Sequence, residues 1–259
     1  MGERLRRFTL CCALLSVGLA AAPVSAGTEQ SLSDSTGTKT ASTQRPPNIV
    51  LILADDLGFS DIAPYGSEIS TPSLSALAAA GVSFTNYHTA ANCAPARAML
   101  LTGVDAHLAG VPNIPEMLAP EQRRYEHYQG VLGHNVVTVA TLLEDAGYHT
   151  YMAGKWHLGS APGLLPSQRG FERTVALADS GADNWEQRPY IPLYDKANWY
   201  ADGEPYQLPE DFYSSRFLVV KTSNLLIATL MIRGRSSLIC LFRRCTYRYR
   251  HQRPSLILT

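Results

Sequence analysis

The chain has little cysteine and no excess of charge of either sign. It holds five cysteines, and its 22 basic residues balance 22 acidic ones. This balance gives no reason to expect nucleic acid or an anionic membrane as the main partner. Cys93 alone lies in the middle of the chain, because the other cysteines fall in an apolar N-terminal run and a basic C-terminal tail. It therefore has no evident disulfide partner, and a lone cysteine in an exported protein invites a chemical explanation.

The composition excludes a disordered chain and predicts one large α/β domain or two small ones. The 259 residues are 46% hydrophobic, which is ample for a core. We divide the chain into a signal peptide (1–26), a flexible linker (27–45), a catalytic portion (46–222) and an aberrant basic tail (223–259). The linker is rich in Ser, Thr and Gly without periodicity.

Residues 1–26 have the three parts of a secretory signal peptide. A basic start precedes an apolar run from Phe8 to Ala22, and small residues follow at 24–26. The run is short for a membrane span, although an uncleaved anchor is the competing interpretation. We therefore expect export to the periplasm or secretion, with membrane contact only through an uncleaved signal.

The apolar run 48–54 is typical of a strand buried on both faces of a largely parallel sheet. It stops at Asp55 and Asp56, where α/β folds place ligands. Adjacent carboxylates repel unless a cation or a basic residue lies between them, so a divalent cation is the economical hypothesis. The alternative is a solvated acidic turn.

A helix is predicted over 94–101, ending at Thr102-Gly103, which places Cys93 at its N-terminus. Exposed backbone N–H groups there favour negative charge, and Arg97 lies one turn along on the same face. An anion bound at this end would meet both features. The alternatives are that Cys93 is a small buried hydrophobe and that Arg97 is a surface arginine.

Further elements follow from local patterns. Thr71-Pro72 begins a core-packing helix that ends at Gly81, and 82–87 is predicted as a second strand. Thr138 caps a helix that ends at Gly147, with Val139, Leu142, Leu143 and Ala146 inward, and a strand follows over 148–153. Residues 160–215 are interpreted as surface loops.

The segment 154–159, Gly-Lys-Trp-His-Leu-Gly, follows that strand as a turn. Lys155 and His157 are two residues apart, so both side chains could point into one site. Taken alone, His157 could equally be a loop histidine with a structural hydrogen bond.

Together these segments resemble the type I sulfatase family, of the arylsulfatase kind. The matching pieces are Pro47 to Asp56, Thr71-Pro72-Ser73-Leu74, the Cys-x-Pro-x-Arg core followed by Leu101-Thr102-Gly103, and Gly154 to Gly159, in the family's order and spacing. The resemblance implies an alkaline-phosphatase-like α/β/α sandwich with a largely parallel central sheet, and hydrolysis of sulfate esters.

The resemblance also implies a modified residue. The motif cysteine of the family is oxidised to formylglycine, so Cys93 would become this residue. Pro95 and Arg97 would complete the motif that a formylglycine-generating enzyme recognises. One hydroxyl of the hydrated aldehyde attacks sulfur and the alcohol leaves; deprotonation of the other hydroxyl expels sulfate and restores the aldehyde.

The remaining motif residues acquire roles by the same carry-over. Asp55, Asp56 and the modified Cys93 would bind calcium, with magnesium as the alternative. Arg97 and Lys155 would hold the hydrate and the sulfate, and His157 would contact the second hydroxyl. The substrate would be a small-molecule or saccharide sulfate ester. Two alternatives stay open: a phosphonate or phosphate ester hydrolase of the same superfamily, and a catalytically dead secreted remnant.

The C-terminal tail departs from the family pattern. From Ser223 onward the sequence is basic and does not follow the helix or strand logic of the preceding part, and the family's later metal, His and Lys residues have no counterpart. Codons for 222–252 read one nucleotide out of frame can spell IEFIDSNLDD and PFFAYLPFSAVHIPIQAP, which resemble the family's continuation. We therefore expect a frameshift near Thr222, and a truncated chain that folds poorly and is inactive.

Overall fold

The computed structural model describes residues 46–231 and 237–244. The expected signal peptide (1–26) and linker (27–45) lie outside the described residues. All described residues belong to one compact unit of the chain. Among them, no helix combines the length and the apolar composition that crossing a membrane requires.

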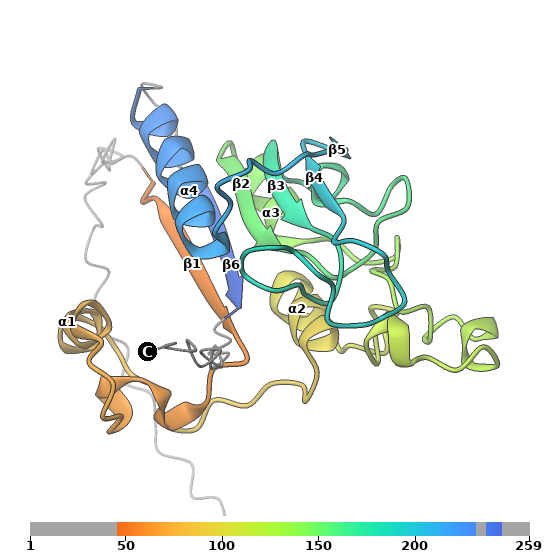
Figure 1. Ribbon diagram of the computed structural model, residues 1–259, viewed down its shortest axis with the longest axis horizontal. Coiled ribbons are helices and arrows are strands. Elements are labelled where there is room, and N and C mark those ends of the chain that lie inside the picture. The colour runs from red at the N-terminus through yellow and green to blue at the C-terminus, as the bar shows by residue number, and fades with distance from the viewer. Residues whose placement is uncertain (1–45, 232–236, 245–259) are drawn as a thin grey trace, which may run out of the picture. The chain divides into compact units, whose positions relative to one another are not determined.

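The described residues form one six-stranded mixed sheet (Figure 1). Its spatial order is β1 (Ile49–Asp55), β6 (Ser237–Arg244), β2 (His149–Lys155), β3 (Arg173–Leu177), β4 (Trp199–Ala201) and β5 (Glu204–Pro205). The first four strands run parallel, and the short β4 and β5 continue the sheet in antiparallel pairs. The predicted largely parallel sheet is therefore confirmed.

Within residues 46–231 and 237–244, four α-helices and five short 3₁₀ helices accompany the sheet. The α-helices are α1 (Pro72–Ala80), α2 (Cys93–Thr102), α3 (Val139–Asp145) and α4 (Ser214–Met231). The 3₁₀ helices are η1 (Phe59–Asp61), η2 (Ala63–Tyr65), η3 (Pro115–Met117), η4 (Gln122–Arg124) and η5 (Pro166–Gln168).

Two apolar clusters cover the two faces of β2. Met152 packs in a cluster with residues of α2 and α3 such as Ala98 and Ala140. The next residue, Ala153, packs with Leu218 of α4 in the other cluster. Because successive strand residues point to opposite faces, α2 and α3 lie on one side of the sheet and α4 on the other. The arrangement is an α/β/α sandwich, as the family resemblance implied.

The first strand and first helix are less buried than the sequence predicted. Val50 and Ile52 of β1 are 51% and 61% exposed, so the strand is not buried on both faces. Helix α1 forms where expected but buries none of its residues, and Leu77 is 64% exposed. The apolar patterns of both elements need a covering layer that the described residues do not supply. The core-packing role expected for α1 is therefore wrong within the described residues.

The caps, inward-facing residues and second strand predicted from local sequence patterns are only partly confirmed. Thr138 caps α3 as predicted, because its hydroxyl accepts a hydrogen bond from the Thr141 N–H at 3.2 Å. Leu142, expected inward, is 59% exposed. The Thr71 hydroxyl accepts from the Ala63 N–H instead of capping α1. Residues 82–87 form no strand, because no described strand lies beside them to complete a ladder.

The segment 160–215 contains more regular structure than predicted. Strands β3, β4 and β5 and the 3₁₀ helix η5 lie inside it, and α4 begins at its end. The sequence of this segment shows little hydrophobic periodicity, yet the five residues of β3, Arg173 to Leu177, all pair with β2. The interpretation as surface loops alone is therefore wrong, because pairing with a neighbouring strand supplies order that a five-residue segment does not reveal by itself.

The C-terminal tail also forms elements. Helix α4 runs through the expected boundary at Thr222 to Met231, and β6 inserts between β1 and β2. The expectation that these residues follow no helix or strand pattern is wrong for 223–231 and 237–244. The apolar run Leu238 to Phe242 suits a strand flanked on both sides. The frameshift itself stays a prediction.

Candidate active site

The candidate site lies at the carboxyl ends of the parallel strands. Asp55 is the last residue of β1 and Lys155 the last residue of β2. Their side chains are 6% and 5% exposed, and the Lys155 Nζ donates to the Asp55 Oδ2 at 2.8 Å. Parallel strands end at the same edge of a sheet, which is why residues 100 positions apart in sequence meet here.

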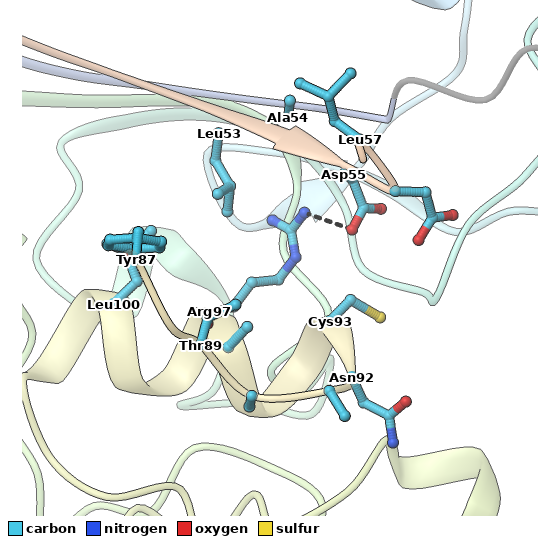
Figure 2. Close-up of a pocket in the computed structure, with 14 residues that line it drawn as sticks. Leu53, Ala54, Asp55, Leu57, Tyr87, Thr89, Asn92, Cys93, Arg97 and Leu100 are labelled. Atoms are coloured by element: carbon cyan, nitrogen blue, oxygen red, sulfur yellow. Dashed lines mark ion pairs between the residues drawn. The ribbon is translucent and has the colours of Figure 1, made fainter. Parts of the chain in front are cut away.

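Arg97 of α2 completes this buried charge cluster. Its Nη2 lies 3.4 Å from the Asp55 Oδ1, and its Nη1 donates to the Lys155 carbonyl oxygen at 2.7 Å. Figure 2 shows the Arg97 and Asp55 side chains pointing toward one another beside Cys93. Arg97 is 1% exposed, so its interpretation as a surface arginine is wrong. Burial lowers the pKa of Arg97, while the Asp55 charge opposes this effect.

A cavity of about 280 Å³ opens beside this cluster. Asp55, Asp56, Cys93 and Arg97 line it together with apolar residues of β1 and the loop before α2. Asp56 itself is exposed. The structure therefore brings both carboxylates and the cysteine to one cavity wall, as the sequence analysis expected.

Cys93 is the first residue of α2, as predicted, and meets His157 from the turn after β2. The Cys93 Sγ lies 3.3 Å from the His157 Nδ1. Burial alone would raise the pKa of the Cys93 thiol, but the hydrogen bond with His157 and the charge of Lys155 lower it from 9.0 to about 7. The contacts of Cys93 with its surroundings therefore favour negative charge at position 93.

The opposite edge of the His157 ring contacts Glu116. The Glu116 Oε2 lies 3.1 Å from the His157 Nε2, and the two side chains are 2% and 1% exposed. Burial lowers the pKa of His157, yet the hydrogen bonds to Cys93 and Glu116 outweigh it and raise that pKa. Burial would raise the pKa of Glu116, but the hydrogen bond with His157 lowers it. Both shifts favour the charged pair.

Two site residues adopt a left-handed backbone conformation. Asp56 has φ 60° and His157 has φ 59°, a region that non-glycine residues rarely occupy. Such conformations persist where the surrounding structure imposes them, and they concentrate at functional sites. Asp56 directly follows β1 and His157 lies two residues after β2, so both unusual conformations occur just after a parallel strand ends.

The donor set at the cavity fits part of a metal site. Asp55 and Asp56 supply the carboxylate oxygens that Ca²⁺ and Mg²⁺ prefer. Within residues 46–231 and 237–244, however, no three His, Cys, Asp or Glu side chains form a group that could hold an ion. Two carboxylates supply fewer oxygens than either ion takes, so further ligands would be needed.

Sequence reasoning missed two acidic residues near the site. Glu116 lies on η3 in a proline-rich passage, where no spacing connects it with His157. Asp179 follows β3, and the Asn198 N–H donates to its Oδ2 at 2.7 Å. Burial raises the pKa of Asp179, with the Glu116 charge adding to the effect against the Asn198 hydrogen bonds. The position of Asp179 just after a third parallel strand could have indicated it. That strand was not predicted, because 160–215 was interpreted as surface loops.

The fold and site define an α/β domain with a buried charge cluster at the carboxyl ends of its parallel strands, and comparisons with known proteins identify its family. The family model described as Sulfatase matches residues 47–231, so the chain belongs to the sulfatase family. It is 41% identical to the arylsulfatase of Klebsiella aerogenes over 177 residues, covering 68% of this chain and 38% of that protein. It is 46% identical to human arylsulfatase A over 137 residues, covering 51% of this chain and 25% of that protein.

A solved structure agrees with the fold. The crystal structure of Ps i-CgsB in complex with k-i-k-neocarrahexaose matches with a TM-score of 0.66 and 25% identity, covering 80% of this chain and 46% of that one. The alkaline-phosphatase-like α/β/α fold expected from the resemblance is therefore confirmed. The chain spans less than half the length of each of these relatives, and the matches extend past residue 222 to residue 231 in the family model.

Proposed function

We propose that this chain is part of a sulfuric ester hydrolase of the arylsulfatase kind that uses a formylglycine made from Cys93. One observation carries the proposal: Cys93 stands at the N-terminus of α2, in one cavity with Asp55, Asp56 and Arg97 and within 3.3 Å of His157. The exposed N–H groups of a helix start and the buried cations favour an anion at this point. Membership of the sulfatase family supports the same reading.

Each residue of the site would have its own role in the reaction. Arg97 and Lys155 would neutralise a tetrahedral anion at position 93, and the hydrogen bond from the Arg97 Nη1 to the Lys155 carbonyl oxygen holds the guanidinium in place. The His157 Nδ1 faces position 93 and can take a proton from a hydroxyl there. Asp55 and Asp56 would hold Ca²⁺, or Mg²⁺ as the alternative; when bound, the ion would supply Lewis-acid charge.

A saccharide sulfate ester is the substrate class we favour. The structural relative named above was crystallised in complex with k-i-k-neocarrahexaose, and this chain shares its fold. The protein would meet such a substrate after export to the periplasm or secretion, which is the expectation from residues 1–26.

Residues 1–259 by themselves should show no sulfatase turnover. The described part of the chain offers Asp55 and Asp56 but no cluster of three ion-binding side chains. Apolar side chains of β1 and of α1, such as Ile52 and Leu77, are also exposed, which lowers the stability expected for the unit. The frameshift near Thr222 remains our explanation for the tail.

The proposal is tested by coexpressing the chain with a formylglycine-generating enzyme. Mass spectrometry of the peptide holding Cys93 should show the aldehyde, and Cys93→Ala should abolish both the aldehyde and the turnover of a frame-restored, longer protein. A matched control is Ser70→Ala, which alters an exposed residue outside the motif and before the frameshift. Absence of formylglycine, or sulfatase activity that survives Cys93→Ala, would contradict the proposal.

The same longer protein separates the phosphate or phosphonate ester alternative. Aryl sulfates and aryl phosphates of equal leaving group are compared by their kcat/KM values. We expect the sulfate to be favoured, and a preference for the phosphate would assign the site to the other ester class.

A further inference from the structure

The contact between Glu116 and His157 is buried and specific. The Glu116 Oε2 and the His157 Nε2 are 3.1 Å apart, and both side chains are almost fully enclosed at 2% and 1% exposure. The other ring nitrogen of His157 faces Cys93 at 3.3 Å. A continuous chain of hydrogen-bonding groups therefore runs from position 93 through the imidazole to a carboxylate.

The chemistry of the carboxylate decides where the ring proton lies. An ionised carboxylate only accepts hydrogen bonds, so the neutral imidazole must carry its proton on Nε2 when it faces Glu116. In that neutral form the Nδ1 presents a lone pair to position 93, whereas the imidazolium favoured beside the Cys93 thiolate carries a proton on both ring nitrogens. Other charged groups lie around this pair: the Lys155 charge adds to the larger effect of the His157 hydrogen bond, which lowers the pKa of Glu116 against burial. Burial, together with the charges of Glu116 and Asp179, raises the pKa of Tyr194.

The backbone around Glu116 holds the carboxylate in place. The short helix η3 starts at Pro115, and the Arg123 Nη2 donates to the Pro115 carbonyl oxygen at 2.6 Å. Gly130, at φ 72°, packs so closely on this segment that an added Cβ would overlap the Leu118 side chain and press on Pro115. This packing fixes the segment that carries Glu116, although the segment has no regular strand or long helix.

We propose that Glu116 is a positioning residue that fixes the His157 proton on Nε2 and keeps Nδ1 directed at position 93. The role of Glu116 in turnover rests on the proposed function. In the step that releases sulfate, the hydroxyl proton at position 93 passes to Nδ1, the C–O bond to sulfate breaks, and its electron pair leaves with sulfate as the aldehyde C=O forms. The carboxylate of Glu116 stabilises the imidazolium that results.

The hydrogen bond can be tested without turnover. The 259-residue chain, labelled with ¹⁵N-histidine, is studied by NMR, and the His157→Asn variant assigns the His157 ring signals among the seven histidines. We expect a deshielded Nε2 proton that exchanges slowly with water. Glu116→Gln replaces a charged acceptor with a neutral one and should speed this exchange by about tenfold. Glu116→Asp keeps the charge, so its Nε2 proton should exchange at a rate closer to that of the parent chain.

The controls separate this role from a structural one. Glu126→Gln removes an exposed carboxylate and should leave the ring signal unchanged. Thermal unfolding identifies any variant that has lost its fold, and Glu116→Asp keeps the test decisive if Glu116→Gln unfolds. The proposal is overturned if the Nε2 proton of a folded Glu116→Gln chain exchanges as slowly as in the parent chain. It is also overturned if this proton exchanges as fast in a folded Glu116→Asp chain as in Glu116→Gln. Absence of formylglycine at position 93 would remove the proposed function and leave this result standing.

Discussion

The Lys155 ammonium and the Asp55 carboxylate form a buried ion pair at 2.8 Å, across the ends of two strands that are not neighbours in the sheet. The sequence analysis expected a metal ion to relieve the repulsion between Asp55 and Asp56. The structure shows that basic side chains already neutralise Asp55, since Arg97 also lies 3.4 Å from its other oxygen. The carboxylate therefore has a structural role in addition to its proposed metal-binding role.

Lys155→Met should destabilise the folded unit because it leaves Asp55 buried with one cationic partner fewer. Removing one member of a buried pair costs about 3 kcal/mol or more. Urea unfolding followed by circular dichroism measures the loss. The double variant Asp55→Asn/Lys155→Met should lose less than the sum of the two single variants, since both charges are then absent. Strict additivity would show that the pair is not coupled.

Cys93 in the unmodified chain should react with iodoacetamide as a partly ionised thiol at neutral pH. Its pKa of about 7 predicts a rate that rises with pH to a midpoint near 7, because the thiolate is the nucleophile. His157→Asn removes the stabilising hydrogen bond and should move the midpoint upward, toward 9.0. Peptide-resolved mass spectrometry distinguishes Cys93 from the other cysteines. An unchanged midpoint in His157→Asn would show that His157 does not stabilise the thiolate.

Gly170→Ala should be among the most destabilising glycine substitutions. Gly170 has φ 89°, and an added Cβ would overlap the backbone nitrogen of Thr141 at the start of α3. Backbone strain and overlap together should cost about 4 kcal/mol. Gly147→Ala is the matched control, because Gly147 has a similar φ of 85° with open space around it, and it should cost only about 1 kcal/mol. Equal losses in the two variants would contradict the packing argument.

Ca²⁺ should stabilise a frame-restored, longer protein and the 259-residue chain to different extents. A ligand that binds only the folded state raises the melting temperature, and a chelator reverses the effect. We expect a clear rise for the longer protein and little change for the shorter chain, whose described part lacks a three-residue ion-binding cluster. Asp56→Asn should weaken the Ca²⁺ effect with little loss of intrinsic stability, because Asp56 is exposed. Strong Ca²⁺ stabilisation of the 259-residue chain would show that its own ligands suffice.

Local patterns predicted the elements that carry the site. The apolar run ending at Asp55 became β1, the small-residue segment after Cys93 became α2, and the strand before Lys155 became β2. These predictions succeeded because capping residues, periodicity and strand ends act over a few residues. The predictions for 82–87 and for the inward face of α1 failed because they depend on neighbours from distant parts of the chain.

The sequence by itself determined the α/β class, the helix start at Cys93 and the family motifs that give each motif residue its expected role. Only the tertiary structure decided which side chains meet. It paired Asp55 with Lys155 and Arg97, and it placed Glu116 against His157 from a segment with no periodic signal. The physical reason is that secondary structure follows from short-range propensities, whereas a buried site is assembled by packing strands and helices from distant parts of the chain.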